Sequence, residues 1–272
     1  MFPLSEEQIR RYARHIVLPG VGGRGQRRLL QSRVLLIGVG GLGSPIALYL
    51  AAAGVGTIGI IDPDVVDLSN LQRQVLFRTE DLGRPKAEVA RERLQALNPD
   101  VRVIPYVTRF TAANARQLVA DYDLIIDGSD NFPTKYLASD VCVWERKPLI
   151  WGAIFQYEGQ VSMVPPGGRP CYRCLLPAPP PPALIPDCQQ AGVFGAVPGT
   201  IGALQALEAL KWLLGLGTSL AGRLLVFDGL RAEWLSVQVE RRPDCPVCGD
   251  HPTVFEPIDY EVFCGLAPRT PA

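Results

Sequence analysis

The sequence has no surplus of charge of either sign. Its 27 Lys and Arg residues balance 27 Asp and Glu residues, and the formal net charge at pH 7 is +0. A chain without a basic surplus lacks the long-range attraction that draws proteins to nucleic acid or to anionic membrane surfaces. The composition therefore argues against both kinds of partner, and any charged patch has to be local.

A hydrophobic run suited to crossing a membrane is also missing. Residues 34–61 carry no charge, but seven glycines and Pro45 interrupt them where a spanning helix would be destabilised. The N-terminal sequence MFPLSEEQIRRY has no basic stretch leading into an apolar one, so we expect no secretory signal. We therefore expect a cytoplasmic protein.

Histidine is scarce as well. His15 and His251 are the only two, and neither stands in a metal-binding or triad pattern. The sequence also has seven cysteines, which are more informative than the histidines. In a reducing compartment cysteines are more typical of metal ligands, nucleophiles or buried thiols than of disulfides.

From residue 33 onward, apolar strand-like runs alternate with helical patterns. With 47% hydrophobic residues among 272, the chain can bury a substantial core. An amphipathic helix with a Ser5 to Gln8 capping box precedes this region. The alternation predicts a Rossmann-like, doubly wound, mostly parallel α/β sheet. The expected order is a buried strand from residue 33, a glycine turn and a helix to Gly54, then strand 58–62, helix 86–99, strand 101–107, helix 111–122 and strand 123–127.

After Pro148 the pattern changes to pairs of strands. Residues 148–154 and 158–164 form one pair, and residues 223–229 and 233–240 form another, which predicts antiparallel strands that extend the sheet. An almost uncharged helix over residues 200–216 should be buried. We divide the chain into an N-terminal helical arm (1–30), the Rossmann-like region (31–165), a region with a crossover loop, buried helix, antiparallel strands and two cysteine pairs (166–250), and a C-terminal tail (251–272).

A glycine-rich turn stands between the first strand and its helix. It contains Gly38, Gly40, Gly41 and Gly43, and Asp62 ends the following strand. Such glycines let backbone N–H groups approach phosphates at a helix N-terminus, and the carboxylate can accept hydrogen bonds from ribose hydroxyls. A nicotinamide or flavin dinucleotide would satisfy the same motif.

Polar residues that suit a polyphosphate follow this turn. They are Asn70, Arg73 and Gln74 in LSNLQRQ, and then Lys86. Two cations near a phosphate crevice can neutralise charge as an oxygen leaves, which hydride transfer does not require.

An acidic run, DGSDN, ends the strand at 123–127. Its position predicts a Mg²⁺ site at the carboxyl edge of the sheet. We assign the metal role to Asp130. Asp127 is interpreted as a turn residue, with capping of the next helix as its alternative role.

Two CxxC pairs indicate a structural zinc site. Four thiolates form a closed tetrahedral set, and a redox role lacks a thioredoxin context. The cysteine after the proline-rich residues 177–186, Cys188, could be presented to a neighbouring site or could be a bystander. Cys142 and Cys264 are interpreted as buried or incidental thiols. The predicted zinc ligands are Cys171, Cys174, Cys245 and Cys248.

These motifs together resemble the MoeB/ThiF group of ubiquitin-activating-enzyme-like adenylyltransferases, from about residue 4 to about residue 249. The resemblance rests on RYARHIVLPGVGGRGQ, GVGGLG, IIDPDVVDLSNLQRQ, LGRPKAE, DGSDN, EGQVSMV, CYRC, DCQQAGVFGAVPGTIGALQALEALK and CPVC. A run of four prolines in the crossover loop departs from the family pattern.

The resemblance implies a homodimer that binds ATP and Mg²⁺ and adenylates the C-terminal Gly-Gly carboxylate of a small ubiquitin-like sulfur carrier. It implies that Arg14 reaches the ATP site of the partner subunit. The family's nucleotide, phosphate and metal contacts fall on Gly41, Asp62, Asn70, Arg73, Lys86 and Asp130. Cys188 matches a position where some members form a covalent sulfur link. The chain has no room for a rhodanese-like domain, so a separate cysteine desulfurase or rhodanese is expected to supply sulfur.

Two other functions fit parts of the pattern. A dinucleotide-dependent oxidoreductase would share the glycine turn but would leave Arg73, Lys86 and Asp130 without a role. A scaffold subunit that has lost its activity would share the whole fold. The sequence does not distinguish a carrier for molybdopterin from one for thiazole or for tRNA thiolation.

Overall fold

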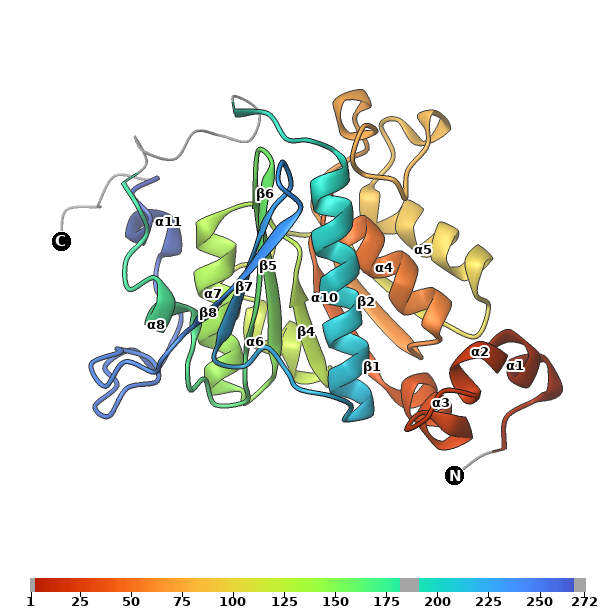
Figure 1. Cartoon of the computed structure of the whole chain (residues 1–272). Coiled ribbons are helices and arrows are strands. Elements are labelled where there is room, and N and C mark those ends of the chain that lie inside the picture. The colour runs from red at the N-terminus through yellow and green to blue at the C-terminus, as the bar shows by residue number, and fades with distance from the viewer. Residues whose placement is uncertain (1–2, 182–190, 267–272) are drawn as a thin grey trace.

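The computed structural model describes residues 3–181 and 191–266. Within them, eight strands form one sheet in the order β3-β2-β1-β4-β5-β6-β7-β8 (Figure 1). The first five in this order run parallel and the last three pair antiparallel. The predicted fold class and both antiparallel pairs are confirmed. The strands are β1 (Arg33–Ile37), β2 (Thr57–Ile61), β3 (Arg102–Tyr106), β4 (Leu124–Asp127), β5 (Leu149–Phe155), β6 (Glu158–Val164), β7 (Arg223–Asp228) and β8 (Glu233–Gln238).

Helices cover both faces of the sheet, so β1 is buried on both sides. Val34 and Leu36 belong to one core cluster with residues of α4, α5 and α10. Leu35 and Ile37 belong to a second cluster with residues of α6 and α7. Successive side chains of a strand point to opposite faces, which explains why β1 is apolar throughout. The helices are α4 (Gly43–Ala53), α5 (Lys86–Leu97), α10 (Ala196–Leu214), α6 (Ala115–Ala120) and α7 (Phe132–Trp144).

Three short helices form the N-terminal arm: α1 (Glu6–Arg11), α2 (Ala13–Ile16) and α3 (Gly22–Gln31). The Ser5 to Gln8 capping box is confirmed. The amphipathic helix expected over this stretch is interrupted at Tyr12, whose buried side chain donates a hydrogen bond to Asp100 and accepts one from Asn98. Figure 1 draws this arm at the lower right, at the opposite end of the sheet from the loops that follow β2.

Helix α10 is buried on one side only. It packs against α4, β5 and β6, and Ile201 and Gln205 are fully buried there. Leu207, however, is 52% exposed, so the expectation of a buried helix is wrong for its outer side. The low charge of α10 is therefore not explained by packing within this subunit.

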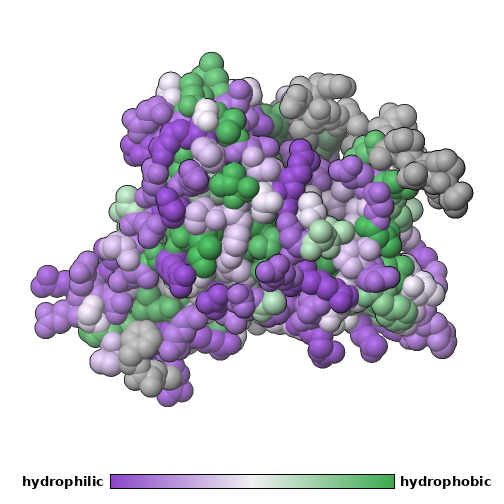
Figure 2. All heavy atoms as spheres, turned by 180° about the vertical axis from the view of Figure 1, so that it is seen from behind, coloured by the Kyte–Doolittle hydropathy of each residue, from purple (hydrophilic) through white to green (hydrophobic). Residues whose placement is uncertain are grey.

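The remaining elements are short: the helices α8 (Tyr172–Leu175) and α11 (Tyr260–Phe263), and the 3₁₀ turns η1 (Leu68–Asn70) and η2 (Thr79–Asp81). Helix α11 packs on α7, within residues that sequence analysis treated as a tail. Across the described ranges, no helix combines the length and the apolar character needed to span a bilayer. On the face drawn in Figure 2, hydrophilic residues separate the apolar patches.

Candidate active site

The glycine turn after β1 has a conformation that requires glycine at two positions. Gly38 has φ +82°, where other residues are strained, and a Cβ on Gly43 would lie 2.1 Å from the Gly38 carbonyl oxygen. In the part of the chain that the structure describes, no side chain caps the N-terminus of α4. The Ser44 N–H donates to the Gly40 carbonyl and Pro45 has no N–H, so the groups that a phosphate can reach are the backbone N–H groups of the turn from Gly40 to Gly43 and the positive end of the helix dipole.

Asp62 lies beside this turn at the end of β2. Its two carboxylate oxygens accept hydrogen bonds from the backbone N–H groups of Val39 and Asp64, each at 2.9 Å. Burial raises the pKa of Asp62 above its ordinary value of 3.8, and these hydrogen bonds and the nearby Lys86 oppose the shift. The carboxylate is held rigidly, and its remaining lone pairs can accept ribose hydroxyls.

A crevice of about 920 Å³ opens at this edge of the sheet. Lys86 is 5% exposed and its Nζ lies 3.2 Å from Asp64 Oδ2, so the ammonium group is held at the crevice wall. Arg73 Nη1 donates a hydrogen bond to the Ser69 carbonyl. The predicted residues that line the crevice together are Gly38, Gly40, Gly41, Asp62, Arg73, Gln74, Lys86 and Asp130.

Two buried polar atoms in the crevice wall are left for a ligand. Among the described residues, Gln74 Oε1 and Ser129 Oγ have no hydrogen-bond partner within the protein. A buried polar atom without a partner costs about 1–3 kcal/mol, so such atoms in a binding crevice are expected to be satisfied by what binds there. Both atoms fit a nucleotide with a polar phosphate chain.

Of the two roles predicted for Asp127 in the acidic run after β4, turn residue or helix cap, the cap belongs to another residue. Asn131, not Asp127, caps α7, by accepting a hydrogen bond from the Thr134 N–H at 3.0 Å. Asp127 accepts one from the Ser129 N–H at 2.9 Å, which confirms the turn role. Asp130 is exposed at the crevice, where its carboxylate can bind a cation.

Sequence analysis missed Lys135, a buried partner of Asp127 on α7. Its Nζ lies 2.8 Å from Asp127 Oδ2 and also donates to the Ser129 and Gly152 carbonyls. The side chain is therefore a support for the loop that carries Asp130. The spacing of eight residues between Asp127, at the end of β4, and Lys135, near the start of α7, carries no recognisable local signal, because the loop between these elements brings the two side chains together.

Some predicted residues are not among those that line the crevice. Gly43 serves the turn itself, and Asn70 Oδ1 accepts a hydrogen bond from the Asp67 N–H within η1. Arg14 is exposed on α2, far along the sheet from the crevice (Figure 1). Cys188 lies outside the described residues.

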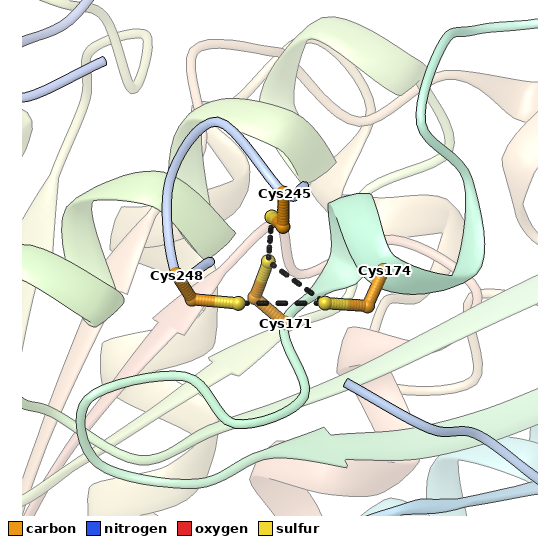
Figure 3. Close-up of side chains that lie close together, drawn as sticks. All are labelled: Cys171, Cys174, Cys245 and Cys248. Carbon is orange, nitrogen blue, oxygen red and sulfur yellow. Dashed lines mark hydrogen bonds between the residues drawn. The ribbon is translucent and has the colours of Figure 1, made fainter. Parts of the chain in front are cut away.

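The four predicted zinc ligands converge. Figure 3 shows Cys171, Cys174, Cys245 and Cys248 pointing toward a common centre from two segments. All are buried, and their Sγ atoms lie within 4.8 Å of one another. Neighbouring Sγ atoms are 3.4, 3.5 and 3.9 Å apart, near the edge of about 3.8 Å that a tetrahedron with metal–sulfur bonds of about 2.3 Å requires. The cluster could hold a metal ion and joins the segment after β6 to the segment after β8.

The match to known proteins agrees with this geometry. The model of the ThiF family matches residues 12–247. The chain belongs to the ThiF family. The match includes the glycine turn, the crevice cations and three of the four clustered cysteines, so the resemblance inferred from the motifs is confirmed.

Relatives of this ThiF-family chain extend over nearly all of it. The sulfur carrier protein adenylyltransferase of Thermus thermophilus is 53% identical over 267 residues, covering 96% of this chain and 98% of that protein. The SAMP-activating enzyme E1 of Haloferax volcanii is 49% identical, covering 97% and 98%. The adenylyltransferase and sulfurtransferase MOCS3 of Bos taurus is 50% identical, and the match covers 96% of this chain but 58% of that protein.

Solved structures share the architecture at lower identity. E. coli MccB crystallised with MccA-N7isoASN has a TM-score of 0.78 at 23% identity, covering 90% of this chain and 75% of that chain. The structure of PaaA has a TM-score of 0.73 at 24% identity, covering 89% and 77%. This likeness concerns the fold.

Proposed function

We propose that this ThiF-family chain adenylates the C-terminal glycine carboxylate of a small ubiquitin-like sulfur-carrier protein. The observation that carries the proposal is the crevice where the glycine turn, Asp62, Arg73 and Lys86 converge. Relatives that are 53% and 50% identical over nearly the whole chain are named adenylyltransferases, which supports this type of reaction. The chain is an ATP-dependent nucleotidyltransferase.

The reaction requires alignment and charge neutralisation rather than a general base. A carboxylate oxygen of the carrier forms a bond to the α-phosphorus of ATP, and the bond from that phosphorus to the bridging oxygen breaks to release pyrophosphate. Arg73 and Lys86 stabilise the negative charge that grows on the departing phosphates, and the turn before α4 orients the phosphate chain. Because a carboxylate is already a nucleophile, no proton has to be removed.

Metal ions have two separate roles in this proposal. Mg²⁺ bound with ATP neutralises phosphate charge, and the exposed carboxylate of Asp130 is the ligand that the protein offers it. Zn²⁺ fills the four-cysteine cluster, whose sulfur-only ligands and spacing suit a closed structural site. Neither ion forms or breaks a covalent bond of the substrates.

A homodimer would complete the site. Arg14 is exposed on α2 and is far from the crevice of its own subunit, so it can act there only if a second copy delivers it. Val17 and Leu18, which follow it, are 73% and 49% exposed, as expected of residues that another chain covers. An arginine supplied by a neighbouring subunit stabilises transition-state charge in the same way as an arginine finger.

The acyl-adenylate is then open to attack by sulfur. We infer that a separate cysteine desulfurase or rhodanese supplies this sulfur in the cytoplasm, either directly or through a persulfide on Cys188. The carrier can belong to molybdopterin synthesis, thiazole synthesis, tRNA thiolation or more than one of them. Adenylation itself uses no thiol, so a Cys188→Ala variant should keep its pyrophosphate exchange.

Carrier-dependent exchange between ATP and labelled pyrophosphate tests the proposal. Each candidate carrier is mixed with the enzyme and ATP, and mass spectrometry detects the acyl-adenylate on the correct one. A dinucleotide-dependent oxidoreductase would instead bind NAD(H) tightly and show no exchange with any carrier. A silent scaffold would show neither activity, although the crevice residues of an active site are retained.

A further inference from the structure

One wall of the crevice comes from a segment near the C-terminus that sequence analysis assigned to a tail. Residues 257–261 line the crevice together with the 109–112 loop after β3 and the beginning of α7. They follow the second cysteine pair and lie beyond residue 247, where the family match ends. No function assigned so far accounts for their place in the site.

Hydrogen bonds from two helices position the approach to this wall. Arg116 Nη2 on α6 donates to the Phe255 carbonyl at 2.7 Å. Trp144 Nε1 on α7 donates to the Val254 carbonyl at 3.1 Å. Because both donors sit on helices of the core, the segment reaches the crevice along a defined path.

A buried polar cluster fixes the far end of the wall. Tyr260 is 5% exposed, and its hydroxyl donates a 2.9 Å hydrogen bond to Asp140 Oδ2 on α7. The same carboxylate accepts hydrogen bonds from Arg173 Nε and Nη2 at 3.0 and 2.8 Å. The Arg173 guanidinium lies 4.5 Å from the centroid of the Phe263 ring. The buried Arg173 guanidinium thus binds a carboxylate along its edge and an aromatic ring on its face, and these contacts hold α11 rigidly.

The chemistry of the crevice differs between its two ends. The glycine turn, Arg73 and Lys86 suit phosphates. Near residues 257–261, Phe110, Leu137 and Ile258 form an apolar part of the lining, with Arg109, Asp259 and Glu261 also lining the crevice. A flat, weakly charged ring gains from contact with apolar side chains, whereas a phosphate would lose its hydration there.

We propose that residues 257–261 are the outer wall of the nucleobase subsite, against which the purine ring of the nucleotide packs. Ile258 contacts the base, and Tyr260 positions the wall through Asp140. The inference rests on the proposed function, since it requires that ATP occupies the crevice. It assigns the segment to nucleotide affinity and not to recognition of the carrier.

Binding of three probes tests this assignment: ATP, adenosine and inorganic triphosphate. The Ile258→Ala variant should weaken the binding of ATP and adenosine alike, each by about tenfold. It should leave the binding of triphosphate, the KM for the carrier and kcat within about twofold of wild type. The Tyr260→Phe variant, which removes only the hydroxyl, should shift the same two affinities in the same direction by a smaller factor.

Two controls separate binding from folding. Phe255→Ala alters a side chain that is 62% exposed and is not among the lining residues, so it should change no affinity. Ile258→Val should recover most of the affinity that Ile258→Ala loses, and thermal unfolding of each variant is recorded beside the binding data.

The outcomes distinguish this inference from the function on which it rests. If Ile258→Ala raises the KM for the carrier while the affinity for adenosine stays unchanged, the nucleobase assignment is wrong. Equal weakening of triphosphate and adenosine also overturns it. Wild-type enzyme that binds ATP but exchanges no pyrophosphate with any carrier would contradict the proposed function, while the probe affinities would still decide the subsite.

Discussion

Lys135 and Asp127 form a buried ion pair at the centre of the site, with Lys135 Nζ 2.8 Å from Asp127 Oδ2 and side chains that are 5% and 0% exposed. The same ammonium group donates to the carbonyls of Ser129 and Gly152. The pair therefore joins α7, the turn after β4 and strand β5. It fixes the loop that presents Asp130 to the crevice.

Breaking this pair should destabilise the protein strongly. Lys135→Met keeps most of the side-chain volume but leaves the Asp127 carboxylate buried without its cation, a loss of about 3–5 kcal/mol in the free energy of unfolding. Urea denaturation of wild type and variant measures this loss in the free energy of unfolding. The exposed pair of Arg231 and Asp228, at 3.8 Å, provides the control, since Arg231→Met should cost less than about 1 kcal/mol.

A second substitution checks the physical reason for that loss. Adding Asp127→Asn to Lys135→Met removes the uncompensated charge and should recover part of the stability. If Lys135→Met lowers the free energy of unfolding by less than about 1 kcal/mol, or if the double variant is less stable than Lys135→Met, burial of an unpaired charge is not the cause.

Mixing of two variant subunits tests whether Arg14 acts in the crevice of the partner subunit. Arg14→Ala and Arg73→Ala should each lower carrier-dependent exchange by about 100- to 1000-fold, because each removes charge stabilisation from the transition state. In an equal mixture of the two variants, half of the dimers are mixed, and each contains one complete site. Activity should return to about a quarter of wild type.

The control for this experiment is an arginine outside the crevice. Arg78→Ala removes an exposed partner of Glu80, 3.4 Å away, and should leave exchange unchanged. If mixed subunits stay as inactive as the separate variants, Arg14 does not act across a dimer interface.

Local patterns in the sequence were enough for most of the fold and for bringing the glycine turn and Asp62 to one crevice. Strand β1, the glycine turn and Asp62 are adjacent elements whose geometry follows from short-range rules, and the cysteine pairs carry their own spacing. The break at Tyr12 was missed because it depends on hydrogen bonds to Asn98 and Asp100. Such contacts, far apart in the chain, leave no periodic signal.

The rest of the site depends on packing between distant segments. Lys135 looks like any surface lysine of a helix until Asp127 and Gly152 are brought beside it. Residues 257–261 fall in the predicted C-terminal tail because Asp140, which accepts the Tyr260 hydrogen bond, lies 120 residues earlier, and Arg173, which binds the same carboxylate, lies between the first two cysteines. The exposed side of α10 has a similar origin, since a helix with only two charged residues, Glu208 and Lys211, can be covered by a second chain as well as by its own.

The raised pKa of Asp62 predicts how ATP binding depends on pH. Burial favours the neutral acid, so Asp62 protonates at a higher pH than an ordinary aspartate. The ionised form accepts ribose hydroxyls and the protonated form has lost part of that capacity. The affinity for ATP should be highest above the raised pKa and should fall as the pH drops through it, with a midpoint above 3.8.

Calorimetric titration with ATP across the acid range measures this midpoint, with circular dichroism as a check that the protein stays folded. The Asp62→Asn variant should bind ATP more weakly than wild type above the raised pKa, should approach wild type below it, and should show a flatter profile. Identical profiles for the two proteins would mean that another group controls the dependence.

Removal of the metal should loosen the link between the segments after β6 and β8. We expect one zinc per subunit by elemental analysis, lost in Cys248→Ala together with several degrees of melting temperature, because the four thiolates otherwise hold two distant segments in one place. Cys142→Ala is the matched control: this thiol is buried too, and burial raises its pKa, but it lies outside the cluster, so the variant should keep one zinc per subunit.

The Arg173 to Asp140 contact lies between the cluster and α11, so metal loss should also weaken ATP binding more than it slows turnover at saturating ATP. Full zinc content in Cys248→Ala, or equal zinc loss in Cys142→Ala, would contradict the assignment of the four cysteines as the ligand set.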